Sequence, residues 1–125
     1  MTEWVSEQLA LLRTQWPDLT YLEADHWVLL PGWNFPEGWS VQNADIACRI
    51  PEAANVAPYA FYVSVAAPTY NGETPDNVTQ SDAVPFKGSW SAFSWAPDGP
   101  WPAACGTSNM LHFVRSFNDR LNEGK

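Results

Sequence analysis

Apolar residues recur at helical spacing near both ends of the chain. The first run predicts a helix over residues 3–16, with Thr2 able to cap it and Pro17 ending it. The second run predicts an amphipathic helix over residues 109–122. The residues that define these two faces are Val5, Leu9, Leu12 and Trp16 in the first helix, and Met110, Phe113, Val114, Phe117 and Leu121 in the second.

Between the helices, shorter runs have the composition or the alternation of strands. Residues 19–30 are rich in aromatic and branched side chains and break at 23–25, which predicts a β-hairpin. Residues 44–50 alternate, and residues 60–66 predict the next strand. The fold class is therefore α+β: an N-terminal helix, an antiparallel meander sheet of about four strands and a C-terminal helix.

Cys48 alternates in step with Ile46 and Ile50 within the strand at 44–50. This alternation places Cys48 on the buried face of the sheet. A thiol in apolar surroundings has a raised pKa and does not react readily. We therefore expect Cys48 to be a core residue without chemical function.

Three other stretches show no sustained periodicity of apolar residues. Residues 31–40 are rich in glycine and proline and predict a surface loop, and residues 68–85 are a polar, turn-rich loop. Residues 88–102 predict a long aromatic loop, with serines among its tryptophans. The aromatic residues of that loop either anchor it to the core or line a binding groove formed by Trp90, Trp95 and Trp101.

Composition and charge narrow the classes of function. With 125 residues the chain is of single-domain size, and we treat residues 1–125 as one domain. The net charge of −8, with only six lysines and arginines, argues against nucleic acid and permits a basic protein partner. Acidic residues at the start and the lack of a long apolar run favour a cytoplasmic protein without membrane contact.

The residues that commonly bind metals or form covalent bonds are few. The two cysteines, Cys48 and Cys105, are too few for a disulfide framework and lack the spacing of a zinc site, so we expect no metal and no cofactor. His26 has no nearby metal-ligating cluster and is interpreted as structural. Residues 77–79 match a glycosylation acceptor, which we interpret as a chance match because no secretion signal precedes it.

Several short motifs follow one another along residues 20–122. They are Leu30-Pro-Gly-Trp-Asn34, Ile46-Ala-Cys-Arg-Ile-Pro51, Pro58, Phe61-Tyr-Val63, Gly88-Ser-Trp90, Phe93-Ser-Trp95 and Trp101-Pro102. In this order they resemble the ubiquitin-conjugating enzyme (UBC-like) superfamily, and in particular its divergent bacterial branch, which occurs beside ubiquitin-like proteins and activating enzymes. The resemblance implies a UBC-like fold and a role in ubiquitin-like conjugation, with the ubiquitin-like protein and its activating enzyme as partners.

The chain departs from the superfamily at the nucleophile. The superfamily has a catalytic cysteine shortly before its tryptophan-proline pair, whereas Ser94 stands in that region here. Ser91 and Cys105 are the alternative candidates. No asparagine lies between residues 78 and 107 to serve as the superfamily's oxyanion donor, and Trp95-Ala96 stands where the bacterial branch often has a basic pair.

A serine hydroxyl needs a base to become a nucleophile, and the sequence does not identify one for Ser94. Asp98 is the nearest carboxylate in the sequence, while His26, His112 and Asp82 could approach only through the fold. Two hypotheses follow from the resemblance. The protein is a transferase that carries the modifier as an oxyester on Ser94, or it is an inactive adaptor that binds the modifier or its activating enzyme. A third hypothesis is an unrelated α+β domain whose aromatic loop binds a small ligand or peptide.

Overall fold

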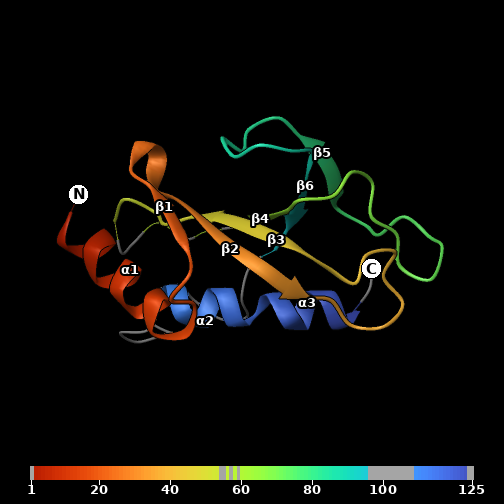
Figure 1. Cartoon of the computed structure of the whole chain (residues 1–125), viewed down its shortest axis with the longest axis horizontal. Helices are drawn as coiled ribbons and strands as arrows, with labels where there is room; N and C mark the ends of the chain where they lie inside the picture. Colours follow the sequence, from red (N-terminus) through yellow and green to blue (C-terminus); the bar gives the residue numbers. More distant parts are fainter. Residues whose placement is uncertain (1, 54–55, 57, 59, 96–108, 124–125) are drawn as a thin grey trace.

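An antiparallel sheet with helices packed against one face makes up the described part of the chain (Figure 1). The computed structural model describes residues 2–53, 56, 58, 60–95 and 109–123, and the features below concern those residues. The chain is α+β, as the sequence predicts. Its elements are α1 (Glu3–Gln15), β1 (Thr20–Leu22), the 3₁₀ turn η1 (Ala24–His26), β2 (Trp27–Asn34), β3 (Asn43–Arg49), β4 (Ala60–Val63), β5 (Val78–Ser81), β6 (Trp90–Ser94), α2 (Asn109–Arg115) and α3 (Phe117–Glu123).

Both predicted helices are present. The hydroxyl of Thr2 accepts a hydrogen bond from the N–H of Val5 at 3.2 Å, which caps α1 as expected. The C-terminal helix is divided at Ser116 into α2 and α3, which lie end to end under the sheet in Figure 1. The Ser116 hydroxyl donates to the carbonyl of Phe113, and a serine that bonds back to the preceding turn often bends a helix.

The sheet has six strands, in the order β1-β2-β3-β4-β6-β5, instead of the expected four or so. The β1–β2 hairpin and β3 lie where the sequence predicts them. The additional strands are β5, inside the expected polar loop, and β6, at the start of the expected aromatic loop. Every neighbouring pair in the sheet is antiparallel.

The expected surface loop at 31–40 is wrong in part, because β2 continues through Pro31 to Asn34. A register shift between Leu30 and Trp33 accommodates Pro31 and Gly32, and Gly32 has a φ of +69°. Trp33 and Trp39 are each only 8% exposed. The indole N–H of Trp39 donates to the carbonyl of Leu121 at 2.8 Å, which fixes this segment to the last turns of α3.

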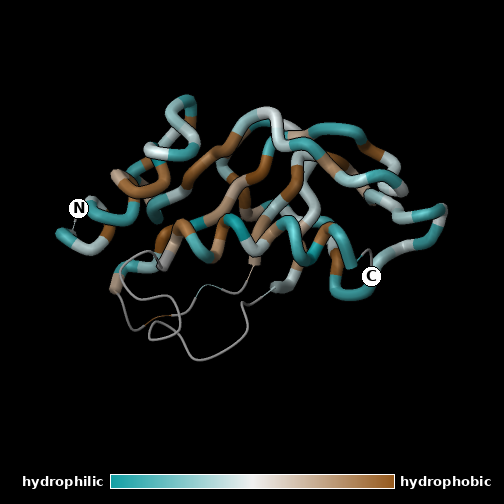
Figure 2. The backbone as a smooth tube through the Cα atoms, turned by 90° about the horizontal axis from the view of Figure 1, so that it is seen from below, coloured by the Kyte–Doolittle hydropathy of each residue, from teal (hydrophilic) through white to brown (hydrophobic). Residues whose placement is uncertain are grey.

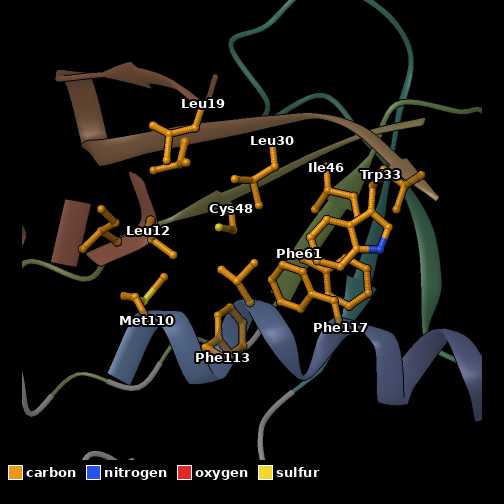
Figure 3. Packing of buried hydrophobic residues seen from close by; sticks show 14 of the residues in the cluster. Leu12, Leu19, Leu30, Trp33, Ile46, Cys48, Phe61, Met110, Phe113 and Phe117 are labelled. Carbon is orange, nitrogen blue, oxygen red and sulfur yellow. The ribbon is translucent and has the colours of Figure 1, made fainter. Parts of the chain in front are cut away.

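The main core lies between the sheet and the helices. In Figure 3, Leu30, Cys48 and Phe61 of the sheet point toward Phe113 and Phe117 of α2 and α3. Figure 2 shows the hydrophobic residues concentrated in the central strands and the sheet-facing turns of the helices, with hydrophilic residues in the outer loops. We call the buried residues that lie between the sheet and the helices the inner cluster.

A second, smaller cluster covers part of the opposite face of the sheet, and we call it the outer cluster. Its buried members come from β2, β3, β6 and the loop after β5, and Tyr62 and Phe86 pack at its border. This cover explains why Ala47, which alternates away from the inner face, is still fully buried. The buried members of the outer cluster are Trp27, Ala47, Val84 and Trp90.

Candidate functional site

Ser94 is the last residue of β6, and its side chain is exposed. Its N–H donates to the carbonyl of Asn77 at 3.1 Å, and its Cα partner on the other side is Ala60 of β4. The neighbouring Phe93 is fully buried in the inner cluster. Ser94 is therefore held by strand pairing on both sides, and its hydroxyl lies on the face of the sheet away from the helices.

Ser91, the alternative serine, is only 2% exposed. Its hydroxyl donates to the carbonyl of Val65 at 2.7 Å. This hydrogen bond joins β6 to the chain just after β4, so the Ser91 hydroxyl has a structural partner and little access to solvent.

Trp90 and Trp95 pack in the two different clusters, on opposite faces of the sheet. Trp90 is 3% exposed in the outer cluster, and its indole N–H donates to the carbonyl of Phe86 at 3.0 Å. Trp95 packs against the inner cluster and donates to the Ser116 hydroxyl at 2.8 Å. These two tryptophans therefore do not share the expected groove. Trp101 and Cys105 lie outside the described residues.

Among the described residues, the side chains that could act as a base for Ser94 do not lie near it. His26 lies in the turn before β2, and its Nδ1 is 2.8 Å from the hydroxyl of Tyr21. Three strand spacings separate β2 from β6, which amounts to roughly 14 Å or more. His112 is on α2, against the other face, and Asp82 follows Ser81, which pairs with the far end of β6. Asp98 lies outside the described residues.

Arg120 is a buried cation under this site that the sequence analysis missed. It is only 4% exposed, its Nη2 donates to the carbonyl of Asp76 at 2.8 Å, and its guanidinium lies 5.4 Å from the centre of the Phe93 ring. Burial lowers the pKa of Arg120, while Glu123 and Asp76 oppose that shift. Arg120 thus holds the segment whose next residue, Asn77, accepts the N–H of Ser94. The sequence feature that could have indicated the burial of Arg120 is its position on the apolar face of the last helix.

Cys48 is fully buried, as the alternation of β3 predicts, and burial raises the pKa of its thiol to about 12. The unfolded thiol ionises near its ordinary pKa of 9.0, so raising the pH from 9 toward 12 favours the unfolded state. In a Cys105→Ala background, we expect Cys48 to resist a thiol reagent at pH 8 until denaturant is added. The release of the reagent's chromophore measures this, with denatured protein as the positive control. Rapid labelling of the native protein would contradict the burial of Cys48.

Within the described ranges, no group of three or more histidines, cysteines and acidic residues is arranged to hold a metal ion. No helix there combines the length and the apolar character needed to cross a membrane. Comparison with protein-family models, curated proteins and solved structures gives no match to this chain.

Proposed function

We propose that this chain is a ubiquitin-conjugating-enzyme-like protein that accepts the C-terminal acyl group of a ubiquitin-like protein on Ser94. The observation that supports this most is the exposed hydroxyl of Ser94, at a rigid strand end directly before Trp95. The other serine of β6 has its hydroxyl bonded to the chain. A rigid scaffold that presents one reactive group at a strand end suits a site that must dock two protein partners.

The proposed reaction has two acyl transfers. The oxygen of Ser94 attacks the carbonyl carbon of the modifier's thioester on the activating enzyme, the thiolate leaves, and a base takes the serine proton. An amine of the acceptor then attacks the oxyester, and the serine hydroxyl is restored. We assign this base to Asp98 or to a partner protein, because the described histidines and Asp82 lie elsewhere in the fold.

The second candidate is an adaptor that binds the modifier or its activating enzyme without chemistry. The distance between Ser94 and the described base candidates favours it, because an unassisted serine hydroxyl is a weak nucleophile. The two candidates differ in whether a covalent adduct forms, and both require binding to the same partners.

Incubation with the cognate activating enzyme, its ubiquitin-like protein and ATP should give an adduct on a denaturing gel. The adduct should survive thiol reductant and be released by hydroxylamine or base, because an oxyester resists thiols. Ser94→Ala should abolish it, and Ser94→Cys should restore an adduct that thiols cleave. Ser91→Ala and Cys105→Ala are the matched controls and should keep the adduct.

Each contrary outcome identifies a different alternative. Loss of the adduct only in Cys105→Ala would assign the chemistry to that thiol. Binding of the partners without any adduct would support the adaptor. Absence of both binding and adduct would refute the proposed pathway.

A further inference from the structure

A cavity opens where strands β3 and β4 separate. The ladder between them contains only the pairs Ile46 with Val63 and Ala47 with Tyr62. Beyond the second pair, β3 stays paired with β2 up to Arg49, while β4 stays paired with β6 from Ala60. The two strands diverge and leave a cavity of about 290 Å³ between them, which we call the β3–β4 pocket.

The walls of the β3–β4 pocket are mostly apolar. Val56 at its border is 50% exposed. The volume is at the lower end for ligand pockets, so the cavity suits a small molecule or one terminal residue of a peptide. The lining residues are Arg49, Ile50, Pro51, Glu52, Val56, Pro58, Ala60 and Tyr62.

Arg49 supplies the one cationic group of this lining, and its position is fixed. Its Nε donates to the carbonyl of Asp25 at 3.0 Å, and its guanidinium lies 5.8 Å from the centre of the Trp27 ring. Its Nη2 is 3.7 Å from the Asp25 carboxylate, beyond hydrogen-bonding distance. These contacts orient the fork of the guanidinium and leave N–H donors for a planar anion.

The charges around the β3–β4 pocket discriminate between ligands. The Arg49 side chain is 52% exposed and that of Asp25 is 73% exposed, so their ion pair is weak and does not cancel the charge of Arg49. Glu52 is also exposed and can turn its carboxylate to water. An apolar ligand that carries one carboxylate would therefore place its hydrocarbon on the walls and its charge on Arg49.

We propose that the β3–β4 pocket binds a small apolar carboxylate, either a free acid or the C-terminal residue of a peptide. The hydrocarbon part contacts Ile50, Pro58 and Ala60, and the carboxylate accepts hydrogen bonds from Arg49. This site is separate from the proposed acyl transfer on Ser94, and binding needs neither the activating enzyme nor ATP. Failure of one proposal therefore leaves the other untouched.

The probe is N-acetyl-phenylalanine, titrated into the isotope-labelled full chain and followed by NMR. We expect saturable shifts at the backbone amides of Arg49, Glu52 and Tyr62 and at the side chain of Arg49. The matched uncharged probe, N-acetyl-phenylalanine amide, should bind about fivefold more weakly, because one exposed charge pair contributes up to about 1 kcal/mol. A phenylalanine-ended tetrapeptide then identifies the source: tighter binding than the free acid indicates a chain terminus, and weaker binding indicates a small molecule.

Three variants test the role of charge. Arg49→Gln should weaken binding of the acid about fivefold, and Glu52→Gln should strengthen it roughly twofold. Arg115→Gln removes the same charge from α2, on the other side of the sheet, and should change nothing. Equal binding of acid and amide, equal effects of the two arginine variants, or no shifts at the pocket residues would each overturn the proposal.

Discussion

Replacing Phe117 by alanine should lower the free energy of unfolding by about 3–5 kcal/mol, because it removes the ring that joins α3 to the sheet. Phe117 is fully buried, and its ring centre lies 4.2 Å from that of Phe61 and 4.9 Å from that of Phe113. The surrounding strands pair on both sides and cannot collapse easily into the space left behind. Urea denaturation followed by circular dichroism measures the change.

Two variants control for the loss of volume and for the helix. Phe117→Leu keeps most of the hydrophobic volume and should cost only about 1–2 kcal/mol. Asn118→Ala, at the exposed next position, should change stability by less than about 0.5 kcal/mol. A Phe117→Ala protein within about 1 kcal/mol of the parent would show that α3 does not pack on the sheet in this way.

Trp39→Ala should cost a similar amount, about 3–5 kcal/mol. The Trp39 ring centre lies 5.3 Å from that of Tyr70 and 5.7 Å from that of Phe93, and its N–H bonds to the carbonyl of Leu121. The side chain therefore joins the segment after β2, the loop after β4, and the end of α3. The same denaturation measurement applies, and near-ultraviolet circular dichroism reports the loss of aromatic packing.

Trp39→Phe separates the hydrogen bond from the packing. It keeps an aromatic ring but leaves the Leu121 carbonyl without its partner, and should cost about 1–3 kcal/mol. Trp39→Ala protein as stable as the parent would mean that Trp39 lies at the surface, as its glycine- and proline-rich sequence context suggests.

The parts of the fold that could be predicted from sequence have one buried side and one exposed side. In α1, Val5, Leu9 and Leu12 are buried while residues 6, 7 and 10 are exposed, which is the source of the helical period. Cys48 could be placed for a similar reason, because its neighbours Ile46 and Ile50 mark the inner face of β3. Periodicity detects a contrast between two environments, so it succeeds where that contrast exists.

β6 could not be predicted in this way because both of its faces are covered where it begins, at Trp90 and Ser91. Trp90 and Ser91 are adjacent and both buried, one toward the outer cluster and one toward the chain after β4. A strand covered on both faces has no alternation of apolar and polar residues. β5 could not be predicted for the opposite reason. Val78–Ser81 is a polar edge strand held by backbone hydrogen bonds, which do not depend on the type of side chain and so give no pattern in the sequence.

The candidate site, too, could be predicted from the sequence only in part. The sequence singles out Ser94, which the structure shows to be exposed, but the separation of Trp90 from Trp95 required knowing that a strand begins at Trp90. The β3–β4 pocket depends on where two strands stop pairing, which is a property of register. Arg49 therefore has no sequence signal as a binding residue, although its place at the end of β3 could be predicted.

The pairing of β4 with β6 has a consequence for how this sequence can change over evolution. Val63 and Ser91 are Cα partners, so residues 64–89 begin and end at almost the same point of the sheet. A short turn could join these two strands, and the central sheet would keep its order. Residues 64–89 supply an edge strand, part of the cover over the outer cluster and the Tyr70 contact with Trp39. Descendants of this sequence can therefore lengthen or shorten this segment while inheriting the same central sheet.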